Sequence, residues 1–225
     1  MRIICDFDGT ISRDDTTDLV LERLASPGWR DLEEDWLTGR ISAAECMRGQ
    51  IALIGGSEAD LDAVLDGAVL DPGFVAFVEW CEARGLPVSI VSDGVDRFIA
   101  RILARDGLER LPVIANRLAG APGGRLLEQP WIRTGCAAGS GVCKCAAAAY
   151  PDTTSAPDTL VYVGDGRSDF CVGGRADILF AKGALADYAQ ARTQSFIPFD
   201  TFDDVTTALA LLVGAASDDA RLAAV

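Results

Sequence analysis

The sequence predicts an α/β fold in which a doubly wound, mostly parallel sheet carries an inserted small helical cap domain. Two observations lead to this prediction. Short apolar runs that can form buried strands alternate with helical patterns over most of the chain, which is typical of parallel sheets. Three of these runs end in polar residues, and the carboxyl ends of parallel strands are where such sheets bind ligands. At 225 residues, the chain is long enough for one core and one insertion.

The first core strand is expected over Ile3–Cys5, an apolar run that leads directly into the motif from Asp6 to Thr10 (D-F-D-G-T). The next stretch, residues 13–81, has apolar residues at helical spacing, and no strand pattern interrupts them. We interpret residues 13–81 as a helical cap. Residues 1–12 and 82–225 then form a Rossmann-like core.

The remaining core elements alternate between strand and helix, which favours a doubly wound sheet. The expected strands are short apolar runs at Pro87–Val91, Val113–Ala115, Leu160–Val163, Ile178–Ala181 and Phe196–Ile197. The expected helices have apolar residues at helical spacing and lie at Ala59–Leu65 (capped by Ser57), Phe74–Arg84, Val95–Asp106 and Thr201–Val213. The tail from Ala215 has weak periodicity, so we expect it to fray.

The charge and composition of the chain limit its partners. Its formal net charge is −14 at pH 7, which argues against nucleic acid or an anionic membrane as a partner. No stretch approaches the ~20 apolar residues of a membrane-spanning helix, and the first apolar run is too short for a signal peptide. The chain has no histidine, so histidine-based catalysis is unavailable. We expect a cytoplasmic protein, and the sequence does not determine its oligomeric state.

Two carboxylates, Asp6 and Asp8, lie two residues apart at the end of the first predicted strand. Both can point into one site if the chain curls as it leaves the strand. Clustered anions repel each other unless a cation neutralises them, and Mg²⁺ prefers a few carboxylates together with waters and a substrate phosphate. The pair therefore indicates a magnesium site in which one carboxylate is a nucleophile and the other a general acid and base. Solvated acids at a strand end are the plainer alternative.

Further polar residues, far apart in the sequence, weaken that alternative. Ser92, Asp93 and Gly94 follow one predicted strand, and the run from Gly164 to Asp169 (G-D-G-R-S-D) follows another. Lys144 is one of only two lysines in the chain and lies in a loop-like region. An ammonium is a compact charge that suits a phosphate and an aspartate together.

The combined pattern resembles the haloacid dehalogenase-like superfamily of aspartate-nucleophile phosphatases. The motifs occur in the order of that family: D-F-D-G-T from Asp6, then Ser92, Lys144 and the G-D-G-R-S-D run that ends at Asp169. The match extends from the N-terminus to about Asp169. Within the superfamily, the chain is most similar to the phosphoserine-phosphatase-like branch, of which the segment Ala115–Leu118 is also typical.

Two segments narrow the resemblance further. The run from Gly164 to Cys171, together with the pair Cys143-Lys144, resembles the phosphoethanolamine/phosphocholine phosphatases. The cysteine-containing segment from Trp131 to Lys144 also resembles the methylthio-ketopentenyl-phosphate phosphatase of methionine salvage. In this superfamily, caps close over the site and exclude water, which the resemblance implies for residues 13–81 as well.

The resemblance implies roles for the individual residues. Asp6 would be the nucleophile and Asp8 the general acid and base. Ser92 and Lys144 would hold the transferring phosphoryl group and stabilise its charge. The implied ligands of an Mg²⁺ cofactor are Asp6, Asp8 (through its backbone carbonyl), Asp165 and Asp169.

Some of these roles have alternatives. Asp169 is either a metal ligand or an acceptor that holds Lys144 and waters. Thr10 either holds Asp8 or the phosphate, or is only a turn or cap residue. Asp15 lies where the phosphoserine branch places a glutamate against the substrate amine, and a solvated turn acid is the alternative. Asp93 either faces a substrate cation or caps the next helix. The candidate phosphate and substrate contacts are Thr10, Asp15, Asp93 and Gly94.

The sequence thus predicts hydrolysis of a small phosphomonoester through an aspartyl-phosphate intermediate. Candidate substrates are phosphoethanolamine or phosphocholine and a methionine-salvage ketose phosphate. Phosphoserine is an alternative, although Gln50 stands where that branch has a carboxylate-binding arginine. Dehalogenation needs no cluster of metal-binding aspartates, and phosphonate cleavage needs a cap lysine that residues 13–81 lack. A non-catalytic metabolite-binding regulator on this fold is the alternative of a different class.

The chain has seven cysteines, an odd number that argues against a disulfide framework. Three of them, Cys136, Cys143 and Cys145, lie close together in sequence. They either bind a metal, form a pair or are only structural. A zinc site would lack a fourth ligand and the usual C-x-x-C spacing. The plainer interpretation is a loop of small residues that carries Lys144 towards the site.

Overall fold

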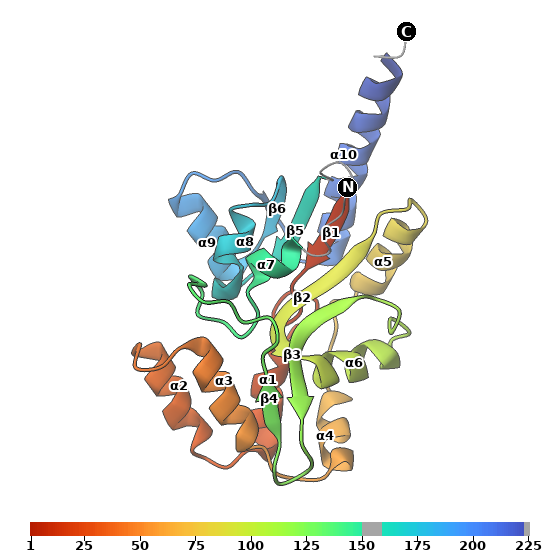
Figure 1. Cartoon of the computed structure of the whole chain (residues 1–225). Helices are drawn as coiled ribbons and strands as arrows, with labels where there is room; N and C mark the ends of the chain where they lie inside the picture. Colours follow the sequence, from red (N-terminus) through yellow and green to blue (C-terminus); the bar gives the residue numbers. More distant parts are fainter. Residues whose placement is uncertain (150–158, 223–225) are drawn as a thin grey trace.

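A computed structural model describes residues 1–149 and 159–222 of the chain. Within these residues, one seven-stranded sheet has the order β4-β3-β2-β1-β5-β6-β7 (Figure 1). All neighbouring strands are parallel except β3 and β4. The strands are β1 (Arg2–Cys5), β2 (Val88–Val95), β3 (Val113–Ala119), β4 (Leu126–Glu128), β5 (Leu160–Gly164), β6 (Ile178–Ala181) and β7 (Ile197–Pro198). The predicted doubly wound α/β sheet is confirmed.

The central strands are buried on both faces, which explains their continuous apolar sequences. Every residue of β5 is buried, and β1 has three buried residues in a row. Because side chains alternate along a strand, Ile3 belongs to the apolar cluster on one face and Ile4 to the cluster on the other. The strand order reverses at β1, where the crossovers change direction. Such a switch point is where open α/β sheets bind ligands.

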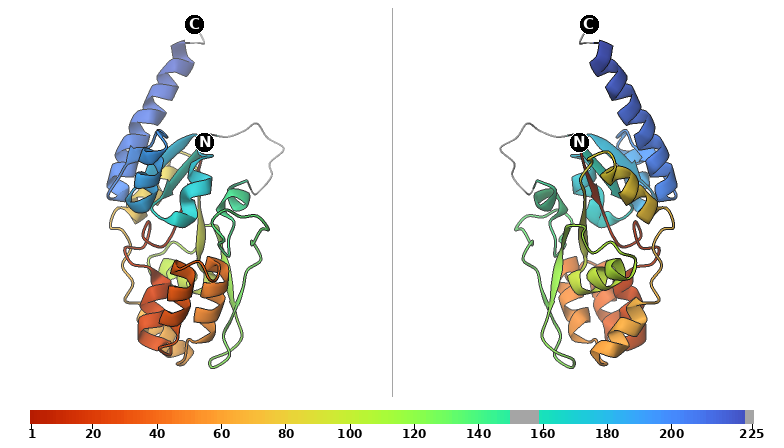
Figure 2. Two further views of the ribbon diagram at one scale, coloured as in Figure 1. Left: turned by 90° about the vertical axis from the view of Figure 1, so that its left-hand side faces the viewer. Right: turned by 90° about the vertical axis from the view of Figure 1, so that its right-hand side faces the viewer.

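Helices cover both faces of the sheet (Figure 2). One face packs against α5 (Phe74–Glu82), α6 (Asp96–Arg105) and α10 (Phe202–Leu222). The rings of Phe74 and Phe202 meet edge to face, with centroids 4.8 Å apart, which joins α5 to α10. The other face packs against α7 (Lys144–Ala148), α8 (Phe170–Gly173) and α9 (Gly183–Ala191). The short 3₁₀ helix η1 (Arg167–Asp169) leads into α8.

Four helices between β1 and β2 form a group beyond the carboxyl end of β1 (Figures 1 and 2). They are α1 (Thr16–Leu24), α2 (Trp29–Leu37), α3 (Ala43–Ala52) and α4 (Glu58–Leu65). Local sequence sets where they begin. Ser42 and Ser57 each close a capping box at the start of α3 and α4, which satisfies backbone N–H groups that the helix leaves unpaired. The predicted cap by Ser57 is confirmed.

The hairpin of β3 and β4 was not predicted. Arg125 precedes β4 and is buried, and its guanidinium donates to the carbonyls of Gly55 and Gly56 and to Glu58. These contacts hold the hairpin against the loop between α3 and α4. A three-residue antiparallel strand gives almost no periodic signal, and its first residue, Leu126, is exposed, so sequence patterning could not reveal it.

Two other expectations need correction. Lys144 does not lie in a loop but is the first residue of α7. The predicted frayed tail is wrong for the backbone up to Leu222, because α10 continues nine residues beyond the predicted end at Val213. No helix within the described residues is long and apolar enough to cross a membrane.

Candidate active site

A cleft of about 560 Å³ opens at the carboxyl ends of β1, β2 and β5. The residues that the motifs predicted lie at the ends of β1, β2 and β5 and at the start of α7, and α1, α2 and α3 supply the facing wall. Residues from three distant motifs therefore meet at one place, as expected for parallel strands. The predicted residues that line the cleft are Asp6, Asp8, Asp15, Ser92, Asp93, Gly94, Lys144 and Asp165.

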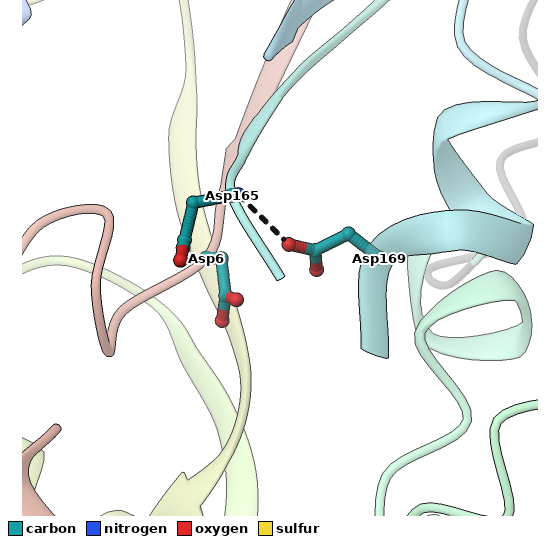
Figure 3. A group of neighbouring side chains, drawn as sticks. All are labelled: Asp6, Asp165 and Asp169. Atoms are coloured by element: carbon teal, nitrogen blue, oxygen red, sulfur yellow. Dashed lines mark hydrogen bonds between the residues drawn. The ribbon is translucent and has the colours of Figure 1, made fainter. Parts of the chain in front are cut away.

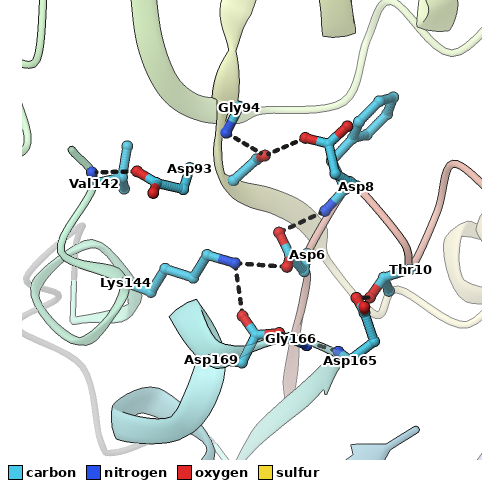
Figure 4. Close-up of polar contacts among 12 residues, drawn as sticks. Asp6, Asp8, Thr10, Asp93, Gly94, Val142, Lys144, Asp165, Gly166 and Asp169 are labelled. Carbon is cyan, nitrogen blue, oxygen red and sulfur yellow. Dashed lines mark hydrogen bonds and ion pairs between the residues drawn. The ribbon is translucent and has the colours of Figure 1, made fainter. Parts of the chain in front are cut away.

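The floor of the cleft contains a buried ion-pair network. The Nζ atom of Lys144 lies 2.6 Å from Oδ2 of Asp6 and 2.6 Å from Oδ1 of Asp169. All three residues are buried. Buried charges are costly unless they are paired and hydrogen-bonded, so this lysine neutralises carboxylates that could not otherwise remain ionised together (Figure 4).

The carboxylate of Asp169 accepts four hydrogen bonds. Its Oδ1 atom accepts hydrogen bonds from Lys144 and, at 2.6 Å, from the hydroxyl of Tyr162. Its Oδ2 atom accepts from the backbone N–H groups of Asp165 and Gly166, both at 3.0 Å. Burial would raise the pKa of Asp169, but the charge of Lys144 and the hydrogen bonds from Lys144, Tyr162 and the Gly166 N–H outweigh this effect and hold the pKa below its ordinary value. Of the two roles predicted for Asp169, the geometry favours the acceptor that positions Lys144.

The pKa values of Asp6 and Asp165 are both shifted upwards. Burial is the main cause at Asp6, and the nearby charges of Asp169 and Asp165 add to it, against the opposing effect of Lys144. Burial also raises the pKa of Asp165, although a hydrogen bond from the Thr10 hydroxyl opposes the shift. The single positive charge of Lys144 therefore does not compensate the charges of all the carboxylates at this point of the cleft.

Asp6, Asp165 and Asp169 each have a carboxylate oxygen that lies within 4.8 Å of one oxygen of each of the others (Figure 3). Oxygen ligands at this spacing suit a hard cation such as Mg²⁺. The raised pKa values of Asp6 and Asp165 fit the same interpretation, because a cation would neutralise both. Since Asp169 already has four donors, Asp6 and Asp165 have the freer oxygens.

Asp8 points away from this group of carboxylates. Its Oδ1 atom accepts from the backbone N–H and the hydroxyl of Thr16, at 2.8 and 2.6 Å. Its Oδ2 atom lies 3.5 Å from the hydroxyl of Ser92. Burial and the charge of Asp15 raise the pKa of Asp8 to about 7. A carboxyl with such a pKa can both donate and accept a proton near neutral pH.

Gly94 and Ser92 shape the space around Asp8. The N–H of Gly94 donates to the Ser92 hydroxyl at 2.9 Å. A Cβ atom on Gly94 would lie only 2.4 Å from Oδ2 of Asp8, so this position excludes any larger residue while Asp8 keeps its place. The glycine predicted as a phosphate contact thus also makes room for the carboxylate.

Asp93 does not cap the following helix, because the cap position of α6 is Val95 and has no side-chain bond. Instead, Oδ1 of Asp93 accepts from the backbone N–H of Val142 at 2.9 Å. Asn116 donates to the backbone carbonyl of Asp93 and to that of Gly94. This hydrogen bond to Val142 ties the end of β2 to the segment just before Lys144 (Figure 4).

Three other candidates have defined positions. Thr10 is buried, and its hydroxyl donates to Oδ1 of Asp165 and not to Asp8, which was the expected partner. Asp15 caps α1, where it accepts from the N–H groups of Thr17 and Asp18 at 2.9 and 3.1 Å. It also lines the cleft. Gln50 is buried in the cleft wall.

Sequence reasoning missed several residues that hold the site. Tyr162 lies inside β5 and reads as an ordinary core residue, yet its hydroxyl binds Asp169. Thr16 begins α1 and binds Asp8. Asn116 was noted only as part of a family-typical segment. A buried hydroxyl needs a partner, so Tyr162 in a strand beside the motifs was the one available signal.

The cysteine cluster gains a fourth member in the structure, Cys171. Its Sγ atom lies 2.7 Å from Sγ of Cys145. Cys136 and Cys143 are also near each other, since their contact contributes to the raised pKa of Cys143 after burial. Among the described residues, no three thiols come close enough together to share one ion. The geometry therefore does not support the zinc alternative.

Comparison with known proteins agrees with this geometry. The family model of the haloacid dehalogenase-like hydrolases matches residues 3–173. A curated relative from Geobacillus thermodenitrificans, 2-hydroxy-3-keto-5-methylthiopentenyl-1-phosphate phosphatase, is 31% identical over 208 residues, covering 90% of this chain and 92% of its own. A protein of the same name from Exiguobacterium sp. is 28% identical over 210 residues, covering 91% and 95%.

Solved structures of similar fold include a phospho-aspartyl intermediate analogue of phosphoserine phosphatase, with a TM-score of 0.64 and 18% identity, covering 88% of this chain and 93% of that one. A probable phosphoserine phosphatase from Vibrio cholerae has a TM-score of 0.74 and 18% identity, covering 96% and 66%. At this identity the likeness concerns the fold alone. With the family model spanning most of the chain and curated relatives that are phosphatases, the chain belongs to the haloacid dehalogenase-like hydrolase family.

Proposed function

We propose that the chain hydrolyses a small phosphomonoester in two steps, with Asp6 as the nucleophile and Mg²⁺ as the cofactor. The observation that carries this proposal is the placement of Asp6 and Asp8 in one cleft with different partners. Asp6 contacts the ammonium of Lys144 at 2.6 Å, whereas Asp8 accepts hydrogen bonds from Thr16 and has a pKa that burial raises to about 7. Two carboxylates with different environments can take the separate roles of nucleophile and acid–base.

In the first step, a carboxylate oxygen of Asp6 attacks phosphorus and the bond to the substrate alcohol breaks. Asp8 gives its proton to the leaving oxygen, which then departs as the neutral alcohol. In the second step, Asp8 takes a proton from a water molecule, and this water attacks phosphorus to release Asp6. Thr16 holds the acid–base group in place through its N–H and hydroxyl.

The phosphoryl group would lie between Asp6, the Ser92 hydroxyl and Lys144. Positive charge and hydrogen-bond donors at this point stabilise the charge on the transferring group, which is the main contribution a protein makes to phosphoryl transfer. Asp6 and Asp165 would hold Mg²⁺, which supplies further neutralisation of that charge. Asp169 keeps the lysine directed towards Asp6.

We further propose that α1–α4, within the predicted cap of residues 13–81, form a cap that closes the cleft over the substrate, whereas α5 at the end of that range packs against the sheet. Support comes from the cleft itself, one wall of which belongs to α1, α2 and α3. Contacts between this group and the core include the N–H of Ala44, which donates to the carbonyl of Gly139 at 2.9 Å. A closed wall would exclude water that competes with the first step.

For the substrate, we propose 2-hydroxy-3-keto-5-methylthiopentenyl 1-phosphate, the compound in the names of the curated relatives. The cleft wall that faces the catalytic residues supports this choice. It contains apolar and sulfur-containing side chains, including Trp36, Cys46 and Met47. A thioether packs favourably against such groups, and an aromatic ring adds to the attraction.

A second candidate substrate class has its own support. Asp15, Asp18 and Glu33 also line the cleft, and carboxylates near a phosphate site favour a substrate with a cation, such as phosphocholine or phosphoethanolamine. Phosphoserine has less support, because Gln50 replaces the expected arginine and its amide donates to the carbonyl of Trp29 at 3.5 Å.

A panel of phosphate esters with Mg²⁺ tests the proposal. We expect release of phosphate from the methylthio ketose phosphate with a kcat/KM at least about tenfold above that for phosphocholine and phosphoserine, equivalent to about 1.4 kcal/mol of transition-state binding. A preference for phosphocholine would favour the second class. No release from any ester, with binding of the metabolite retained, would favour the non-catalytic regulator.

A further inference from the structure

Two cysteines that the proposed chemistry does not use lie beside its ion-pair network. Cys145 directly follows Lys144 at the start of α7, and Cys171 lies two residues after Asp169 in α8. Their Sγ atoms are 2.7 Å apart, and both thiols are free. A disulfide bond measures about 2.05 Å, so a small approach of the sulfurs is enough to form one.

We propose that Cys145 and Cys171 are a site of reversible disulfide formation, which joins α7 to α8 next to the ion pair of Lys144 and Asp169. The effect of this disulfide bond would follow from the position of the two cysteines. The two segments it would link carry the lysine and the carboxylate that contact each other at 2.6 Å. A covalent link there restricts separation of α7 from α8 and therefore separation of Lys144 from Asp169.

The two thiols differ in their exposure to the cleft, which determines which of them reacts first. Cys171 is half-buried and lines the cleft, whereas Cys145 is buried. A peroxide that enters the cleft would therefore meet Cys171 first. The Cys171 sulfur attacks one peroxide oxygen and the O–O bond breaks. The second oxygen leaves as water, with the proton that the Cys171 thiol gives up.

The second step is intramolecular. The sulfur of Cys145 attacks the sulfur of the Cys171 sulfenic acid, the S–O bond breaks, and the hydroxyl leaves as water with the proton of the Cys145 thiol. In total, two thiols lose two protons and two electrons, and hydrogen peroxide is reduced to two waters. A dithiol reductant reverses the reaction by thiol–disulfide exchange.

The decisive measurement is the intact mass and peptide map of the full chain after reduction, removal of the reductant and exposure to hydrogen peroxide. We expect a loss of about 2 Da per chain, a linked peptide containing Cys145 and Cys171, and recovery of the original mass with dithiothreitol. Cys171→Ser should abolish this loss. Cys136→Ser is the matched control, because Cys136 is another half-buried thiol of the same cluster, and it should keep the bond.

A second readout is thermal unfolding of the oxidised and the reduced chain. Because the link closes a loop in the unfolded state, oxidation should raise the melting temperature by about 5–10 °C, and Cys171→Ser should show no such rise. A linked peptide that joins other cysteines, a disulfide between two chains, or an unchanged mass would overturn the proposal. So would a melting temperature that falls on oxidation.

Discussion

The Nζ atom of Lys144 lies 2.6 Å from Asp6 and 2.6 Å from Asp169, with all three side chains buried. Burial alone would lower the pKa of this lysine, but the two carboxylates more than offset that effect and raise the pKa above its ordinary value. Lys144 therefore remains charged at neutral pH. It is both a structural counterion and a cation in direct contact with the proposed nucleophile.

Lys144→Met should lower kcat by about 10²-fold or more, because the transferring phosphoryl group loses its cation. The same change should reduce the free energy of unfolding by about 3–5 kcal/mol, since it leaves two buried carboxylates without their counterion. Steady-state kinetics and urea unfolding measure the two effects. Lys182→Met, at the only other lysine, is the control. An unchanged kcat in Lys144→Met would remove this residue from the catalytic machinery.

Asp6→Asn should abolish turnover and leave the fold intact. Asparagine keeps an oxygen that can accept the Phe7 N–H, which Asp6 binds at 2.7 Å, but it is not a nucleophile. We expect loss of steady-state activity with a cooperative thermal transition, and loss of the slow-dissociating complex that beryllofluoride forms with an aspartyl nucleophile. Asp14→Asn, at an exposed acid of the following turn, should retain activity. Covalent labelling by substrate phosphate in Asp6→Asn would contradict the assignment.

Much of this site could be predicted because its residues follow buried strands. A strand buried on both faces, such as β1 or β5, is a continuous apolar run and is easily recognised. The acidic residues that follow such runs are easily recognised as candidate site residues, because a strand seldom requires acidic residues at its end. The positions of Asp6, Ser92 and Asp165 in one cleft were therefore expected from the order of the motifs.

The supporting contacts could not be predicted in the same way. Tyr162 and Thr16 bind the carboxylates through hydroxyl groups whose direction depends on tertiary packing. The helix α7 has only five residues, too few to be stable alone, so packing against the sheet determines it and with it the position of Lys144. The same is true of β4, a three-residue strand that depends on its pairing with β3 and on its contacts with α3.

Gly94→Ala should lower kcat at least about tenfold without unfolding the protein. The added Cβ would lie 2.4 Å from Oδ2 of Asp8, so the carboxylate must move, and small misplacements of a catalytic group are costly. Gly124→Ala is the matched control, because its nearest neighbour would be a carbonyl oxygen at 4.0 Å. Equal activity of the two variants would show that Asp8 tolerates displacement and is not the acid–base group.

The chelator-treated protein should lose stability as the pH rises from about 4 to 8. In the folded state the pKa of Asp8 is raised to about 7 and the pKa values of Asp6 and Asp165 are also raised, whereas in the unfolded chain all three approach about 3.9. Between the unfolded-state and the folded-state pKa values, the folded state binds more protons than the unfolded state. The stability of the fold is therefore greatest at the low end of the pH window and decreases as the pH rises through the folded-state pKa values.

Thermal unfolding in EDTA across this pH window measures the effect. Mg²⁺ should raise the melting temperature more at pH 8 than at pH 5, because a bound cation replaces the protons and stabilises the folded state by mass action. In Asp165→Asn, the melting temperature should depend less on pH and should rise less on addition of Mg²⁺. Full activity in excess chelator would contradict the role of a metal.

Asp93 provides the last test, because its environment distinguishes a residue that binds substrate from one that positions Lys144. Its Oδ1 atom accepts from the N–H of Val142, two residues before Lys144, at 2.9 Å. If this bond positions the lysine, Asp93→Ala should lower kcat by the same factor for phosphocholine and for the methylthio ketose phosphate, with KM nearly unchanged for both. Asp93→Asn keeps an acceptor oxygen and should restore most of kcat.

The alternative role of Asp93, binding of the substrate, predicts a different result. If the Asp93 carboxylate faces a substrate cation, Asp93→Asn should raise KM for phosphocholine by a larger factor than for the neutral ester, because a charged partner in a partly dry cleft is lost. The structure favours the first outcome, since the bond to Val142 already uses Oδ1 and the Asn116 amide lies 3.4 Å from the same atom. A selective change in KM would instead assign Asp93 to the substrate and make an aminoalcohol phosphate the better candidate.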